Sequence, residues 1–416
     1  MDANIHEWLN LIVRWIHVIF GIMWIGSSIF FNWLDSSFEP LKGEQEEGTV
    51  GEVWMVHGGG FYHVKKKYLK ASEIPETLYW FKWEAGFTFI SGITLLTLVY
   101  YMTGGIYLID PNVSNITEGQ AITLCIALLI GAWGIYDTVW NSKLAKNPAP
   151  LATICFLAVI AIAYGLSQVL SARAAYMHIG AMLGTIMAAN VWMRILPAQN
   201  VMMKAVTSGQ PLDPTPGLKA KMRSKHNNYM TYPVIFIMIS NHFPNAYAHH
   251  LNWLLLAILI VASVIIKHFL NISEHFKYWF PRALAVGTVA LVALFFVSSI
   301  PDPKNVVAQV ENHDNQINSN SNNTNVSTEK VTFNQAREVI QKRCMVCHSA
   351  KPTDDMFKVA PVGVMFDTPQ QIQSKAERIK IRAVTTKTMP LGNKTHITDE
   401  ERLILAKWID QGAKIE

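Results

Sequence analysis

Eight apolar stretches constrain the fold of this chain more than any other feature of the sequence. They lie at residues 9–31, 84–103, 119–139, 150–170, 174–194, 229–244, 251–269 and 281–300. A helix needs about 20 apolar residues to cross the hydrocarbon layer of a bilayer. The sixth stretch is the weakest, because Pro233 and Pro244 shorten it. With half of its 416 residues hydrophobic and 16% charged, the chain is predicted to be all-α, with an eight-helix transmembrane bundle.

Lys and Arg are distributed unevenly among the loops between these stretches. Loops 32–83, 140–149, 195–228 and 270–280 carry most of them, whereas loops 104–118, 171–173 and 245–250 contain only Arg173. An excess of Lys and Arg marks the cytoplasmic side of a membrane protein. We therefore expect both termini outside the cytoplasm, which in a Gram-negative bacterium means an inner-membrane protein with its C-terminal part in the periplasm.

The composition changes abruptly after Ile300. Residues 301–329 are rich in Asn and Ser and have no apolar period, which is typical of a flexible linker. The sequence therefore divides into a membrane domain (1–300), this linker and a small soluble domain (330–416). It contains no basic stripe or Arg-rich arm, so nothing in it indicates a nucleic-acid partner.

The soluble domain contains a haem attachment motif. Residues 343–350 read RCMVCHSA. In this C-x-x-C-H pattern, Cys344 and Cys347 can form thioethers to the haem vinyl groups, and His348 is set against the iron. The same pattern can arise by chance or form a redox pair. However, c-type haem is attached outside the cytoplasm, which agrees with the predicted orientation.

The residues around the motif support one covalent haem c. Residues 332–343 predict a helix before it, and residues 398–412 predict a closing helix that opens with a capping box. Met389, in TMPLGN ahead of the closing helix, is the candidate sixth ligand, with Met356 and Met365 as alternatives. The domain resembles class I cytochrome c over roughly 330–416. The resemblance implies the two cysteines as attachment residues, His348 as proximal ligand and Met389 as distal ligand.

Three histidines fall at similar depth in the outer half of the predicted bundle. At about 1.5 Å rise per residue, they are His17, His178 and His242. Neutral imidazoles on facing helices can hold a haem iron inside a bundle, so these three are candidates for a haem b or another redox centre. The alternative for each is a hydrogen bond between helices. An electron carrier at this depth would divide the path of about 30 Å across the membrane into two shorter transfer steps.

Another group of polar residues lies toward the cytoplasmic ends of the predicted helices. One interpretation is a buried ion pair of Glu84 or Asp137 with Arg194. The other is a polar cavity bordered by a hairpin, predicted in residues 51–68 about the triple glycine. Such a cavity could hold a flat anionic ligand. Glu84, Asp137, Arg194 and His226 are therefore candidates for catalysis, with a carboxylate or the imidazole as general base.

Several motifs together resemble the bacterial membrane-bound urate hydroxylases. They are RWIHVIFGIMWIGSS, FNWLD, HGGGFYHVKK, KWEAGFTFISG, HNNYMTYPV and ISNHFP, and the resemblance covers essentially the whole chain. It implies oxidation of urate to 5-hydroxyisourate with oxygen from water. Two electrons would pass to the cytochrome c domain, and from there to a terminal oxidase or a soluble cytochrome c. The resemblance gives no residue-level mechanism, so the catalytic candidates above come from the residues alone.

Two other functions share many of these features. A b/c-type quinol dehydrogenase or electron conduit would have the same histidines and the same tail without purine chemistry. A copper-handling or transport protein with a redox-sensing tail would hold metal instead of haem b in the bundle. Haem c reduction by urate rather than by quinol separates the first alternative from urate oxidation.

Overall fold

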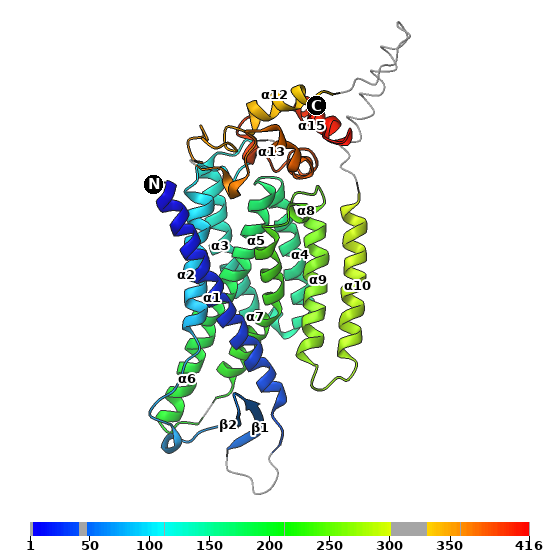
Figure 1. Ribbon diagram of the computed structural model, residues 1–416. Helices are drawn as coiled ribbons and strands as arrows, with labels where there is room; N and C mark the ends of the chain where they lie inside the picture. The colour runs from blue at the N-terminus through cyan, green and yellow to red at the C-terminus, as the bar shows by residue number, and fades with distance from the viewer. Residues whose placement is uncertain are drawn as a thin grey trace.

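The computed structural model describes residues 3–40, 48–111, 113–211, 213–300, 331–357 and 359–415. The described chain is mostly helical, as expected. Long helices lie side by side in one bundle, and a small C-terminal domain sits at the end of the bundle where the N-terminus also lies (Figure 1). The linker predicted at 301–329 lies outside the described residues.

The helices of the bundle follow the predicted order. They are α1 Ala3–Ser37, α2 Trp83–Leu96, α3 Glu118–Asn141, α4 Pro148–Ser167, α5 Ala172–Asn190, α6 Leu196–Thr207, α7 Thr215–Ser240, the short α8 Pro244–Tyr247, α9 Asn252–Asn271 and α10 Trp279–Ser298. A π-helical turn, Thr97–Tyr101, extends α2. Within the described residues, seven helices are long and apolar enough to cross a membrane.

The sixth apolar stretch differs most from its prediction. Helix α7 begins at Thr215 and ends at Ser240, and it runs through Pro233 without ending. A proline inside a membrane helix is tolerated where neighbouring helices and local adjustments compensate for the lost hydrogen bond. The first half of α7 is rich in Lys and Arg, so this helix is long but is not among the seven apolar ones.

The fifth stretch also extends beyond its predicted end at residue 194. A π-helical turn, Val191–Ile195, joins α5 directly to α6, so the helical path continues to Thr207. Pro197 lies inside this continuous path, directly after the π-helical turn, and local π adjustments of this kind accommodate proline in long helices. Helix α6 therefore projects beyond the bundle (Figure 1).

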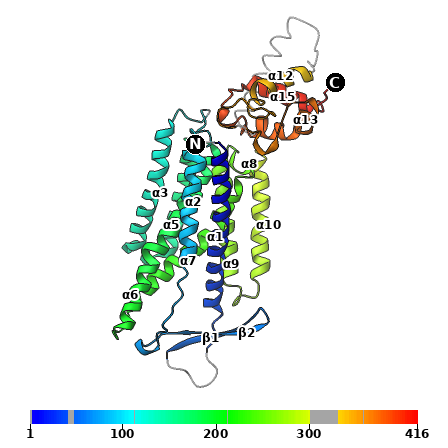
Figure 2. The same cartoon turned by 60° about the vertical axis from the view of Figure 1, so that its left-hand side comes forward.

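The predicted hairpin is confirmed. Strands β1 (Thr49–His57) and β2 (Gly60–Lys67) pair antiparallel, with Trp54 opposite His63. Gly58 and Gly59 form the turn with φ of 60° and 82°, a conformation that suits two-residue hairpin loops and that other residues adopt poorly. The hairpin lies across the end of the bundle opposite the C-terminal domain (Figure 2), so the Lys-rich loops and that domain are at opposite ends.

Helix α5 is the most buried helix of the bundle. Ile179, Met182 and His178 are almost fully buried. A Cβ added to Gly180 would lie 2.7 Å from a methyl carbon of Ile237, so α5 and α7 approach closely at this glycine. The packing of α5 fixes both of its ends, which hold Arg173 on one side and Asn190 on the other.

The C-terminal domain has its own small core. Its helices are α12 Phe333–Arg343, α13 Pro369–Ser374, α14 Ala376–Ile379 and α15 Asp399–Asp410. Phe333 and Trp408 pack with ring centroids 5.7 Å apart. The predicted capping box is confirmed, since the Thr398 side chain accepts a hydrogen bond from the Glu401 backbone.

Candidate functional site

A cavity of about 1090 Å³ lies between the bundle and the C-terminal domain. The bundle lines it with the loop after α2, the start of α5, the end of α7 and the residues after α8. The C-terminal domain lines it with the haem motif and with the segment before α15. Cys344, Cys347, His348 and Met389 all lie on its wall, together with Tyr107, Arg173, Asn241 and His250. We call it the interdomain cavity.

Local hydrogen bonds hold the motif in shape. Helix α12 ends at Arg343, and the backbone N–H groups of Cys347 and His348 both donate to the Cys344 carbonyl, at 3.2 and 2.9 Å. The ring Nδ1 of His348 is hydrogen-bonded to the Val364 carbonyl at 3.0 Å. A histidine that donates from Nδ1 keeps the lone pair of Nε2 for a metal. Met356 and Met365 are described but do not line the cavity.

The pKa values of both thiols of the motif are raised. Burial raises the pKa of Cys344 to about 12. Burial, together with the nearby Asp354, raises the pKa of Cys347 to about 11. Redox-active C-x-x-C pairs depend on a lowered thiol pKa. The electrostatics here therefore favour attachment over disulfide chemistry.

The cavity wall of the C-terminal domain is rich in cations. Arg343 is paired with Glu401, and Lys394 with Asp354. Lys375, Arg378 and Arg382 also line the cavity, and none of them has a carboxylate partner in the described part of the chain. These three can receive acidic groups of a bound molecule such as the propionates of a haem.

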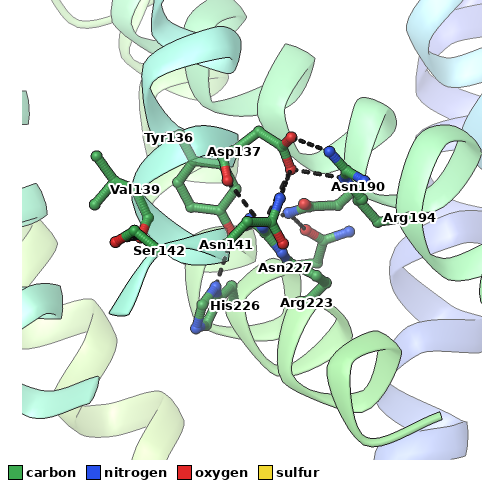
Figure 3. Close-up of polar contacts among 10 residues, drawn as sticks. All are labelled: Tyr136, Asp137, Val139, Asn141, Ser142, Asn190, Arg194, Arg223, His226 and Asn227. Atoms are coloured by element: carbon green, nitrogen blue, oxygen red, sulfur yellow. Dashed lines mark hydrogen bonds and ion pairs between the residues drawn. The ribbon is translucent and has the colours of Figure 1, made fainter. Parts of the chain in front are cut away.

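The polar residues at the far end of the bundle form a second assembly (Figure 3). Asp137 of α3 accepts hydrogen bonds from Arg194, at 2.8 Å from Nε, and from Arg223, at 3.1 Å from Nη2. Tyr136 is hydrogen-bonded to His226 Nδ1 at 2.7 Å. We call this assembly the inner cluster; it comprises Tyr136, Asp137, Asn190, Arg194, Arg223, His226 and Asn227.

Three of the four predicted catalytic candidates meet in the inner cluster. They are Asp137, Arg194 and His226, whereas Glu84 in the first turn of α2 makes none of these contacts. The ion pair of the first interpretation is present, with Asp137 as the carboxylate. Sequence reasoning missed Arg223, which is 2% exposed. Its position three residues before His226, on the same helical face, could have identified it.

The three outer histidines have different surroundings, and His242 is exposed in the turn that follows α7. His17 Nδ1 is hydrogen-bonded to the Thr88 carbonyl (3.0 Å) and the Ser91 hydroxyl (3.1 Å). His178 uses both ring nitrogens, Nδ1 to the Ala174 carbonyl and Nε2 to the Tyr101 hydroxyl. The described residues contain no cluster of three or more His, Cys, Asp or Glu that could hold a metal ion. A haem b here stays a prediction, and it would require the Tyr101 hydroxyl to release Nε2 of His178 if this histidine were a ligand.

Comparison with known proteins identifies the bundle. The family model described as urate oxidase N-terminal matches residues 3–324. This chain belongs to the urate oxidase N-terminal family. No curated protein and no solved structure was found to match it.

The urate oxidase N-terminal match contains all the candidates in the bundle. His17, Glu84, Asp137 and Arg194 lie within it, as does Arg173 at the interdomain cavity. The match ends before Cys344, so the role of the C-terminal domain depends on its own residues. The family relation makes the chain a urate-oxidase-related protein.

Proposed function

We propose that this protein is a membrane-bound oxidoreductase that oxidises urate and delivers the electrons to a haem c in its own C-terminal domain. One observation carries the proposal: Cys344, Cys347, His348 and Met389 line a single cavity whose other wall belongs to the bundle of a urate-oxidase-related family. The proposed electron acceptor site and the urate-oxidase-related bundle therefore line the same cavity, which supports the proposal.

The residues of the cavity fit a covalent haem. Cys344 and Cys347 would attach it, and His348 Nε2 and the Met389 sulfur would bind its iron. Its propionates would be received by cations without a carboxylate partner among the described residues, namely Lys375, Arg378 and Arg382. A His/Met-ligated haem c accepts one electron at a time at a relatively high potential.

The reaction balances with water as the second reactant. The urate monoanion and one water molecule give 5-hydroxyisourate, one proton and two electrons. A C–O bond forms at C5 of the purine, with oxygen from water, and the electron pair leaves the ring. A one-electron acceptor takes it in two successive transfers. Each electron then passes to a terminal oxidase or a soluble cytochrome c.

The proposed setting is the bacterial cytoplasmic membrane, with the C-terminal domain on the periplasmic side. Seven apolar helices and α7 supply the proposed eight spans. The hairpin and the Lys-rich loops at the opposite end would face the cytoplasm. This orientation puts Cys344 and Cys347 on the side of the membrane where c-type haem is attached.

The proposal is tested with purified protein in detergent. Urate should reduce the c-type haem band under anaerobic conditions, and a quinol should not. Changing Cys344→Ala together with Cys347→Ala should abolish haem-stained protein on a denaturing gel, while Cys155→Ala, a thiol in α4, serves as the control and should keep the stain. If a quinol reduces the haem c and urate does not, the protein is a quinol dehydrogenase and the proposal of urate oxidation is wrong.

A further inference from the structure

The interdomain cavity offers a place for the substrate as well as for the haem. We propose that its bundle wall is the binding site for a planar purine anion, with Arg173 as the group that binds its negative charge. This inference rests on the proposed function and adds the position of the site. It moves the substrate from the inner cluster to the end of the bundle beneath the C-terminal domain.

Arg173 is held by neutral groups. Its Nε donates to the Asn241 side-chain oxygen at 3.0 Å, and its guanidinium carbon lies 4.9 Å from the centre of the Tyr107 ring. In the described part of the chain no carboxylate is within ion-pair distance of it. A partly buried guanidinium without a counterion is unfavourable, and an anionic ligand would compensate it.

The arginines of the inner cluster have the opposite arrangement. Arg194 and Arg223 both donate to Asp137, so their charge already has a partner. Arg194 uses both its Nε and one Nη for this carboxylate. An anion that bound there would have to displace Asp137, whereas an anion at Arg173 would displace no carboxylate.

The surroundings of Arg173 suit a flat heterocycle. The Tyr107 ring, the Asn241 amide and the His250 imidazole line the same wall of the cavity. Together they provide an aromatic surface and hydrogen-bonding groups for ring nitrogens and carbonyl oxygens. Pockets for small molecules combine such groups and have volumes of about 300–1000 Å³. The volume of this cavity, about 1090 Å³, is just above that range.

A shared cavity also simplifies the redox step. The substrate and the acceptor would have no protein wall between them, so the two electrons could leave the purine ring in two direct transfers. Water in the cavity supplies the oxygen for the new bond at C5, and the proton goes to solvent. A carrier inside the bundle is then unnecessary.

Equilibrium binding of urate tests the inference. Purified holoprotein is kept reduced with dithionite under anaerobic conditions, so that its haem c cannot take electrons from urate. It is titrated with urate by isothermal calorimetry, and the reduced haem c band checks folding. Arg173→Gln should weaken binding about tenfold or more, because a charge-assisted contact is lost. Asn241→Asp should do the same with almost no change in shape, because its carboxylate would neutralise Arg173. Arg194→Gln, the matched control, should bind as the unchanged protein does.

Two outcomes would overturn the inference, and they differ in meaning. If Arg173→Gln and Asn241→Asp bind urate normally and Arg194→Gln does not, the site is the inner cluster and the proposed function stands. If the unchanged protein neither binds urate nor is reduced by it, the proposed function fails along with the site.

Discussion

Asp137 balances the charge of the inner cluster. Its carboxylate accepts hydrogen bonds from Arg194 and from Arg223, and the Arg223 side chain is only 2% exposed. Removing one partner of a buried ion pair leaves an uncompensated charge, which costs about 3–5 kcal/mol. We therefore expect Asp137→Asn to lower the thermal unfolding midpoint of the solubilised protein markedly. Arg194 is the more exposed of the two arginines, so Arg194→Gln should lower the free energy of unfolding by only about 1 kcal/mol or less.

A second substitution separates a structural role from a chemical one. Adding Arg223→Met to Asp137→Asn should restore part of the lost stability, because the buried charge is then absent. If Asp137→Asn melts normally but no longer supports haem reduction by urate, the carboxylate takes part in the chemistry instead.

Single residues were predictable where a local spacing carries the chemistry. Cys344, Cys347 and His348 lie within five residues, and the structure brings them to one cavity with Met389. Arg173 was visible only as the sole basic residue of the outer loops. Its partners Tyr107 and Asn241 come from segments more than sixty residues away on either side, and no local pattern contains that contact.

Helices α12 and α15 are joined by a half-buried ion pair. Glu401 of α15 accepts hydrogen bonds from Arg343 at the end of α12, at 2.8 and 2.9 Å. Burial opposes ionisation of Glu401, but the hydrogen bonds from Arg343 and from the Thr398 backbone outweigh it and lower the pKa of Glu401. A carboxyl group whose pKa is lower in the folded than in the unfolded protein stabilises the fold at pH values above its pKa in the unfolded protein. This stabilisation is lost as the pH falls through its pKa in the folded protein.

The C-terminal domain should therefore lose stability as the pH falls below about 4.5, the ordinary pKa of glutamate. Denaturant titrations of the full chain at several pH values, followed by haem c absorbance, measure this loss. Glu401→Gln should flatten the pH dependence, while Glu338→Gln, on the exposed face of α12, should not. Parallel curves for all three proteins would contradict this role of Glu401.

Elements were predictable where their signals are local. The capping box of α15 and the triple glycine of the hairpin each lie within a few residues, and both predictions are confirmed. The start of helix α7 was mispredicted because residues 215–228 are rich in Lys and Arg and were assigned to a loop. The close approach of α5 to Ile237 of α7 is a tertiary contact that no local pattern in the sequence contains.

The C-terminal domain touches the bundle at Gly392. This residue has a φ of +56°, and a Cβ added to it would lie 3.2 Å from the Ile106 carbonyl oxygen. Gly392→Ala should therefore move the domain away from the bundle and slow the reduction of haem c by urate, measured by stopped-flow absorbance. Gly363→Ala is the control, because Gly363 has a similar φ of +64° and open space around it. Equal rates in the two variants, at equal haem content, would show that this contact does not set the transfer distance.

The position of the domain against the bundle also bears on the number of haems. If the substrate and haem c share the interdomain cavity, one redox centre suffices. His178, a histidine predicted to bind a second haem, has both ring nitrogens engaged by the Ala174 carbonyl and the Tyr101 hydroxyl. We therefore expect the pyridine haemochrome spectrum of the purified protein to contain one c-type haem per chain and no b-type band. His17→Ala should leave that spectrum unchanged. A b-type band that disappears in His17→Ala would restore the carrier inside the bundle and return the substrate to the far end of the membrane domain.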